Sequence, residues 1–349
     1  MRFAWLHHSA AGRRLAGLAA CWLAFSITAA DLPKGISRER YLVWEGALRL
    51  ESPEAEALAV IVPELGGRVM RYEVMGENIL WDNAAAYERP GSQGRKAPPP
   101  GGYQVYVASD STPLGEMERL VYGSYKVATP RAFTVTLTSE PELIRELVLE
   151  KEITLDPEKG DLGLVQRLTN KGSREIVCGL RSRTQCRGGG FFVAPLNKYS
   201  RFRFGWTLRH IVEDQAIYDS LNPGHDRVKI TGGFLIAQTG GTGPEVRLGM
   251  DVSAEWVAYV YDRSLFVLYF PYDFRAKYPH GGHTIELGWN QWIAEIEVLA
   301  PDEPLAPGKT VTAPMKWALI PLKEAVTNAK QARAAAAKVP PSPFSPARK

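Results

Sequence analysis

The sequence predicts an all-β protein, one large antiparallel β-sandwich that ends in a short helix. Short apolar or alternating runs, separated by turns rich in Gly, Pro, Asn and Asp, recur through most of the 349 residues. Helical periodicity is convincing only in residues 323–338, which are rich in Ala and Lys. With 45% hydrophobic and 23% charged residues, the chain can bury a sizeable core, in one large β domain or in two smaller ones. No internal repeat has the period of a solenoid or a propeller, which favours the sandwich.

Residues 1–30 have the pattern of a secretory signal peptide. Three arginines precede an apolar run over residues 15–27, and Thr28-Ala29-Ala30 offers a small-residue cleavage site before Asp31. The apolar run is shorter than the roughly 20 residues that a membrane-spanning helix needs. We therefore expect an exported protein, periplasmic or extracellular, without a membrane span.

The segment Leu18-Ala19-Ala20-Cys21 also resembles a bacterial lipoprotein box, in which the cysteine carries a lipid after cleavage. The apolar run continues past Cys21, which such signals usually do not do. Free export and a lipid anchor both stay open. The predicted organisation is a signal at 1–30, a β domain at 31–322 and a basic, partly disordered tail at 323–349.

The charge balance does not point to a nucleic-acid partner. Removing residues 1–30 leaves 39 basic against 38 acidic residues, and six of the basic ones lie in residues 323–349. The predicted β domain is thus slightly acidic, which is unlike a nucleic-acid-binding surface. The sequence predicts no cofactor and does not indicate an oligomeric state.

Two cysteines, Cys178 and Cys186, remain after the predicted cleavage. An exported protein meets an oxidising compartment, in which they could pair. Seven intervening residues suit a bridged loop, and they suit two buried free thiols equally well.

Apolar or alternating runs between turn signals locate the predicted strands. We expect strands over residues 58–62, 68–72, 79–81, 133–138, 143–155, 162–170, 175–180 and 191–193, and two more within 256–270. Residues 83–102 are too rich in Pro and Gly for regular structure and predict a long surface loop.

The strand predicted over residues 292–299 carries two carboxylates on one face. Alternation places Trp292, Ala294, Ile296 and Val298 on a core face, and Ile293, Glu295, Glu297 and Leu299 on the other. A Pro- and Gly-rich turn at 301–308 leads to a strand over 310–320, in which Pro314 indicates a sheet edge. Glu295 and Glu297 are either a solvated edge-strand face or a functional pair.

Three segments in this order resemble the galactose-mutarotase-like (aldose 1-epimerase-like) β-supersandwich superfamily: AVIVPELGGRVMRYEVMGENILW, LVQRLTNKGSREIVCGL and WIAEIEVLAPDEPLAPG. The resemblance covers most of residues 58–322. It is strongest to the uncharacterised, often exported members, a domain of unknown function in which a pair like Thr184-Gln185 and a closing Glu-x-Glu strand are familiar.

The resemblance implies a sugar-binding concave face and, in the epimerases, a Glu base with a His acid that open and close a pyranose ring. The base position falls on Glu297, with Glu295 two residues away on the same face. The stretch that should hold the acid, residues 178–185, contains no histidine. Mutarotase chemistry therefore needs another acid, because arginine stays protonated.

His280 and His283, just before the acidic strand, are the candidates for that acid. Ordinary loop histidines are the commonest interpretation of such a pair, and the alternatives are contact with a sugar or a metal site with Asp273 or Glu286. Spacing fixes no third ligand, so no metal site is predicted.

Five further residues are candidates for substrate contacts. Arg183 and Gln185 could hydrogen-bond sugar hydroxyls or a carboxylate, and the resemblance puts Arg68 where the superfamily often lines its cleft, with a salt bridge as the alternative. Tyr272 and Trp289 could stack on a sugar ring or pack in the core.

Three functions follow. The first is an exported carbohydrate-binding protein. The second is a sugar epimerase that uses Glu297 or Glu295 with His280 or His283, and the third is a non-catalytic structural or interaction domain.

Overall fold

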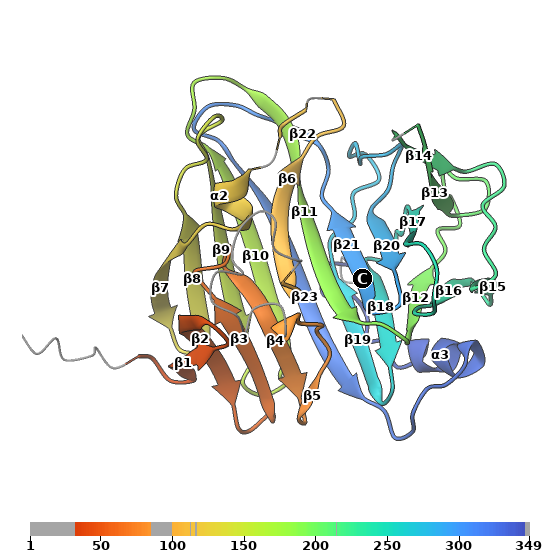
Figure 1. Ribbon diagram of the computed structural model, residues 1–349, viewed down its shortest axis with the longest axis horizontal. Coiled ribbons are helices and arrows are strands. Elements are labelled where there is room, and N and C mark those ends of the chain that lie inside the picture. Colours follow the sequence, from red (N-terminus) through yellow and green to blue (C-terminus); the bar gives the residue numbers. More distant parts are fainter. Residues whose placement is uncertain (1–31, 85–99, 112, 116, 214, 346–349) are drawn as a thin grey trace, which may run out of the picture. The chain divides into compact units, whose positions relative to one another are not determined.

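The computed structural model describes residues 32–84, 100–111, 113–115, 117–213 and 215–345, and these residues form two large antiparallel sheets (Figure 1). The first sheet has the order β1-β2-β3-β4-β6-β11-β21-β20-β17-β13-β14, with β5 paired to β4 and β22 paired to β11. Its strands are β1 (Ile36–Tyr41), β2 (Trp44–Ser52), β3 (Ala57–Val62), β4 (Arg68–Val74), β5 (Glu77–Asn78), β6 (Tyr103–Ala108), β11 (Ile176–Arg187), β13 (Thr207–Val212), β14 (Gln215–Asp219), β17 (Val246–Met250), β20 (Ile285–Trp289), β21 (Ile293–Leu299) and β22 (Glu303–Leu305).

The second sheet has the order β15-β16-β12-β18-β19-β23-β10-β9-β8-β7. Its strands are β7 (Tyr125–Arg131), β8 (Thr134–Ser139), β9 (Leu147–Leu155), β10 (Leu162–Asn170), β12 (Phe191–Pro195), β15 (Val228–Thr231), β16 (Phe234–Gln238), β18 (Trp256–Tyr261), β19 (Ser264–Tyr269) and β23 (Thr310–Pro321). Two short helices are described, α2 (Glu118–Val121) and α3 (Ala329–Ala336).

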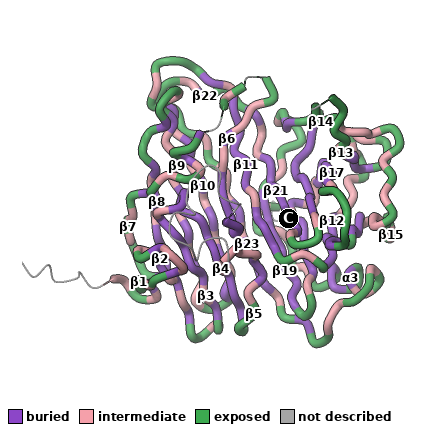
Figure 2. Tube along the Cα trace, in the orientation of Figure 1, coloured by how far each residue is buried: buried purple, intermediate pink, exposed green. Residues whose placement is uncertain are grey.

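One apolar core joins the two sheets, because alternate residues of both point into the space between them. Trp317 of the second sheet lies at its centre, with ring centroids 5.1 Å from Tyr103 and 5.7 Å from Tyr72 of the first sheet. Buried residues recur along the strands of both sheets (Figure 2). The prediction of an all-β sandwich with a short C-terminal helix is confirmed.

The C-terminal helix α3 packs on the outer face of the second sheet. Asn328 caps it by accepting a hydrogen bond from the backbone N–H of Gln331, and Ala332, Ala335 and Ala336 are buried against that sheet. The residues that follow stay in contact with the sheet, since Tyr269 donates to the carbonyl of Pro340 at 3.1 Å. The predicted tail is therefore packed through this part, and residues 346–349 lie outside the described residues, as does the predicted signal at 1–30.

Two predictions about the closing strands are wrong. Trp292 is 66% exposed rather than core, because Asn290 Oδ1 accepts from the N–H groups of Trp292 and Ile293 and so forms the turn before β21 begins. The strand β23 is central, between β19 and β10, rather than at an edge. Pro314 pairs with Val165 of β10, but the ladder between β23 and β19 covers only residues 316–321 of β23. Pro314 is tolerated because it has no partner residue in β19, so its missing N–H breaks no hydrogen bond of that ladder.

Both cysteines are buried as free thiols, which decides between the two possibilities that their spacing left open. No helix among the described residues is long and apolar enough to cross a membrane.

Candidate functional site

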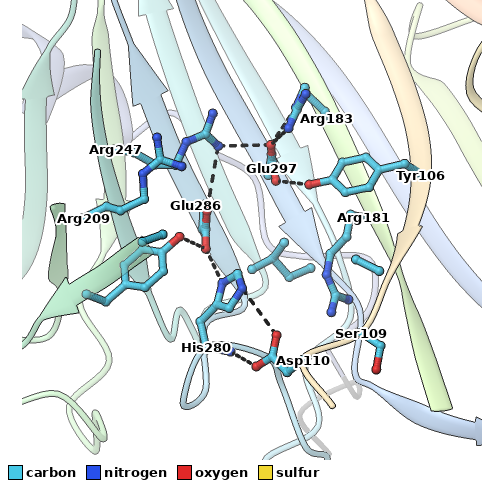
Figure 3. A pocket seen from close by; sticks show the side chains of 14 residues that line it. Tyr106, Ser109, Asp110, Arg181, Arg183, Arg209, Arg247, His280, Glu286 and Glu297 are labelled. Carbon is cyan, nitrogen blue, oxygen red and sulfur yellow. Dashed lines mark hydrogen bonds and ion pairs between the residues drawn. The ribbon is translucent and has the colours of Figure 1, made fainter. Parts of the chain in front are cut away.

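A cavity of about 570 Å³ opens on the face of the first sheet that points away from the core (Figure 3). Its lining comes from β6, β11, β21, β20, β17, β13 and β14 and from loops beside them. The lining residues are Tyr106, Ala108, Ser109, Asp110, Arg181, Arg183, Arg209, Ala216, Tyr218, Arg247, His280, Glu286, Glu297 and Leu299.

Cross-strand register brings the charged residues of the cavity together. Arg183 of β11 lies opposite Glu297 of β21, and Glu297 lies opposite Glu286 of β20. The same row continues through Gly249 of β17 to Thr207 of β13. Since residues directly opposite one another have Cβ atoms about 5 Å apart, their side chains must interact.

One half of the cavity floor is an arginine cluster, made of Arg183, Arg247, Glu295, Glu297 and Tyr106. Glu297 Oε1 accepts from Nε of Arg183 at 2.6 Å and from Arg247 at 3.1 Å, and Oε2 accepts from the Tyr106 hydroxyl at 2.7 Å. Arg247 also donates to Glu295 at 2.5 Å. Both carboxylates are buried, so the alternative of a solvated edge-strand face is wrong.

The arginines set the ionisation of Glu297. Burial alone would raise its pKa, but the charges of Arg183 and Arg247, with the hydrogen bond from Tyr106, lower the pKa to about 2. The same carboxylates raise the pKa of both guanidinium groups above the ordinary value, against the effect of burial. At neutral pH Glu297 is therefore a stable carboxylate and a weak base.

The Arg247 side chain passes over Gly288 of β20 within this cluster. Gly288 lies opposite both Arg247 and Glu295 in the sheet, and a Cβ at this position would sit 3.4 Å from the guanidinium carbon of Arg247. Arg247 therefore extends across β20 to reach carboxylates on β21.

The other half of the floor is a histidine cluster, made of His280, His283, Glu286, Tyr218 and Asp110. Glu286 Oε1 lies 2.5 Å from His280 Nδ1 and 3.4 Å from His283 Nδ1, and it accepts from the Tyr218 hydroxyl at 2.6 Å. Asp110 lies 3.4 Å from His280 Nε2. Figure 3 shows His280 between Glu286 and Asp110.

A tight turn explains why the two histidines converge. The N–H of His283 donates to the carbonyl of Pro279 at 2.8 Å, and His280 has a φ of 51°. The His283 imidazole then lies over Gly249, where an added Cβ would come within 2.0 Å of the ring. Only glycine at that position leaves space for His283.

The histidine cluster favours an ion pair. Burial alone would raise the pKa of Glu286, but hydrogen bonds from His280, His283 and Tyr218 hold it far below the ordinary value. Burial opposes protonation of His280, yet the hydrogen bond and charge of Glu286, with the charge of Asp110, raise the pKa of His280 above 6.5.

The predicted site residues divide into three groups. Arg183, His280 and Glu297 line the cavity, the fully buried His283 lies directly behind its lining, and Glu295 lines a neighbouring cavity of about 220 Å³. Gln185 donates to Glu295 at 2.9 Å and, with the buried Trp289, borders the same neighbouring cavity.

Arg68 and Tyr272 lie away from the main cavity. Arg68 is buried and donates to the carbonyl of Gly101 at 3.1 Å and to the side chain of Gln104. Tyr272 stacks on Tyr278 with ring centroids 5.8 Å apart.

Sequence reasoning missed Tyr106, Arg247, Tyr218 and Asp110. Alternation within YQVYVA and VRLGM would have placed Tyr106 and Arg247 on the face of their strands that points away from the core. No such signal marks Tyr218, on a short edge strand, or Asp110, on a loop.

Solved structures with the galactose-mutarotase-like fold resemble this chain. A galactose mutarotase-like protein from Clostridium acetobutylicum superposes with a TM-score of 0.54 at 12% identity, over 84% of this chain and 99% of its own. One from Lactobacillus casei gives 0.53 at 13% identity, over 79% and 100%. A galactose mutarotase related enzyme from Lactobacillus acidophilus gives 0.52 at 10% identity, over 80% and 99%.

No family model matches the sequence, and no curated protein matches it either. The chain thus shares the galactose-mutarotase-like fold, as the sequence resemblance predicted.

Proposed function

We propose that this chain is an exported carbohydrate-binding protein that takes its ligand in the cavity on the first sheet. The observation that carries the proposal is the lining itself, which combines arginines, carboxylates, tyrosines and a histidine around a cavity of about 570 Å³. That volume is within the roughly 300–1,000 Å³ of small-molecule sites. Arginine and carboxylate groups hydrogen-bond hydroxyls well, and tyrosine rings offer flat apolar surface.

The state of Glu297 favours binding over efficient turnover. A general base works best with a pKa near the working pH, whereas the pKa of Glu297 is about 2. The guanidinium groups of the half-buried Arg183 and the buried Arg247, together with Tyr106, already occupy its oxygens. Glu297 therefore holds the arginines in place more readily than it takes a proton.

A sugar epimerase is the second candidate, because His280 and Glu297 line the same cavity. In that reaction one group removes the proton of the anomeric hydroxyl while another protonates the ring oxygen. The His280 imidazole, partly exposed beside Glu286, would supply the acid. Polarimetry of freshly dissolved aldoses should show mutarotation faster than the uncatalysed rate, and His280→Ala should return it to that rate, if this candidate is right.

Calorimetric titration with neutral sugars, oligosaccharides and uronic-acid oligosaccharides, in buffer containing EDTA, tests carbohydrate binding. Arg209 lines the cavity, and the ion pair described for it is with the exposed Glu245 at 3.2 Å, so its guanidinium is accessible to a ligand. Losing a charge-assisted hydrogen bond in Arg209→Ala should weaken binding by about 10–100-fold.

Arg203→Ala is the matched control, because Arg203 is exposed and lies outside the cavity lining. It should bind like the wild type. The proposal fails if no glycan binds at millimolar concentration, or if a bound glycan has equal affinity for both variants.

Export is tested separately, on the envelope and secreted fractions of a bacterial host. N-terminal sequencing should begin at Asp31 after cleavage of a signal, whereas a lipid on Cys21 would indicate the anchored form. An N-terminus at Met1 in the cytosol would contradict export.

A further inference from the structure

We propose that His280, His283 and Glu286 bind one divalent first-row transition metal ion, such as Zn²⁺, at the floor of the cavity. The proposal does not rest on carbohydrate binding, since the ion is held by the side chains of this chain alone. It rests on where three ligand atoms converge and on what holds the histidines from behind.

Three potential ligand atoms converge, and one of the separations between them already has the spacing that a metal requires. They are Nδ1 of each histidine and Oε1 of Glu286, and the group lies within 4.8 Å. A tetrahedral ion with bonds of about 2.0–2.1 Å places its ligands roughly 3.3 Å apart. The His283–Glu286 separation of 3.4 Å matches this spacing.

The His280–Glu286 contact of 2.5 Å must lengthen by about 0.8 Å to admit the ion. His280 is on an exposed turn with its side chain 36% accessible, so a small rotation suffices. The ion takes the place of the proton in the hydrogen bond between His280 Nδ1 and Glu286 Oε1, and that proton leaves to solvent.

The outer nitrogen of each histidine has an oxygen partner, as metal-binding histidines usually do. His283 Nε2 lies 3.0 Å from the hydroxyl of Thr207, and His280 Nε2 lies 3.4 Å from Asp110 Oδ1. Metal binding requires both Nδ1 atoms to give up the protons that they donate to Glu286, the His283 proton moving to Nε2. Each Nε2 then donates to its oxygen partner, and both Nδ1 lone pairs face the ion. Two independent elements, β13 and the loop after β6, thus orient the two histidines for one ion.

The donor set selects the class of metal. Two imidazole nitrogens with one carboxylate suit Zn²⁺, Fe²⁺, Co²⁺, Ni²⁺ or Cu²⁺, whereas Mg²⁺ and Ca²⁺ prefer sites made of oxygen. His280 and Glu286 line the cavity, so a fourth coordination position would open toward it. There a metal could hold water or a hydroxyl of a ligand as a Lewis acid.

The test is a calorimetric titration of the full-length chain, stripped with EDTA and desalted, with ZnCl₂ and without any sugar. We expect one Zn²⁺ per chain at about micromolar affinity or tighter. Glu286→Gln and His283→Ala should each weaken binding by more than about 100-fold, and Asp110→Asn by about 10–100-fold. Co²⁺ should give visible absorption bands in the wild type that Glu286→Gln lacks.

His210→Ala is the matched control, because His210 is exposed on β13 outside the cluster, and it should bind like the wild type. If His283→Ala does not fold, Glu286→Gln and Asp110→Asn still decide the matter. The proposal is overturned if the wild type binds no stoichiometric Zn²⁺, if Glu286→Gln binds it equally well, or if Mg²⁺ binds as tightly as Zn²⁺.

Discussion

The two halves of the cavity floor hold buried carboxylates in opposite ways. In the arginine cluster, Glu297 is surrounded by two guanidinium groups that cannot lose their protons at any ordinary pH. In the histidine cluster, Glu286 Oε1 faces two imidazoles and a phenol, which can exchange protons or ligands, while its Oε2 lies 3.8 Å from Arg247. The comparison separates a half whose basic groups keep their protons, and so stabilise the fold, from a half whose histidines can exchange protons or bind a ligand.

The largest effect should come from breaking the arginine cluster. Glu297→Gln removes one of the two carboxylates that compensate Arg183 and Arg247, and breaking a buried ion pair costs about 3–5 kcal/mol. Urea denaturation should show a loss of that size in the free energy of unfolding. A loss below about 1 kcal/mol would mean that Glu295 and solvent compensate the arginines without Glu297.

Acid should weaken the same cluster in a definite pH window. The pKa of Glu297 falls from 4.5 to about 2 on folding, so its contribution is complete above pH 4.5 and is lost as the pH falls through 2. The shift corresponds to about 3 kcal/mol, more than half of it lost by pH 3. The stability gap between wild type and Glu297→Gln, followed by urea denaturation from pH 6 to pH 3, should narrow accordingly. A constant gap would contradict this origin.

A pair of tyrosine variants compares the halves directly. Tyr106→Phe removes the partner of Glu297 Oε2 and should cost about 1.5–3 kcal/mol, as for a hydrogen bond to a charged group. Tyr218→Phe should cost less, because Glu286 Oε1 keeps His280. Thermal or urea unfolding ranks the two, and the reverse order would show that the histidine cluster is the more stabilising half.

Two glycine substitutions probe the space in each half. Gly249→Ala places a methyl group within 2.0 Å of the His283 ring, and overpacking of this kind costs about 1–3 kcal/mol. Gly288→Ala meets Arg247 at 3.4 Å, an ordinary contact, and should change stability by less than about 1 kcal/mol. Equal effects of the two substitutions on the free energy of unfolding would contradict the claim that His283 needs the space over Gly249.

The sequence was informative wherever alternation or turn chemistry acts locally. The strand at 162–170 was predicted with its observed ends, and the shared face of Glu295 and Glu297 followed from period-two alternation. The same rule failed at Trp292, because it was extended across a turn that the Asn290 side chain forms.

The arrangement of the site depends on pairing that no local pattern encodes. Arg247 meets Glu297 only because β20 lies between β17 and β21, and Tyr218 reaches Glu286 only from the edge strand β14. The order of the strands therefore pairs the Glu297 carboxylate with two arginines. It also brings His280 and His283 together at Glu286. The sequence could name most of the charged residues, but it could not say which would be partners.

Urea unfolding of wild type, Glu297→Gln and Glu286→Gln, in EDTA and again with saturating ZnCl₂, tests the division between the two halves most directly. In EDTA, Glu297→Gln should lose the most stability. Zinc should then stabilise wild type and Glu297→Gln by the same amount and leave Glu286→Gln unchanged, because a ligand stabilises only the folded state that binds it. Equal stabilisation of all three proteins by zinc, or a larger loss in Glu286→Gln than in Glu297→Gln in EDTA, would contradict the account.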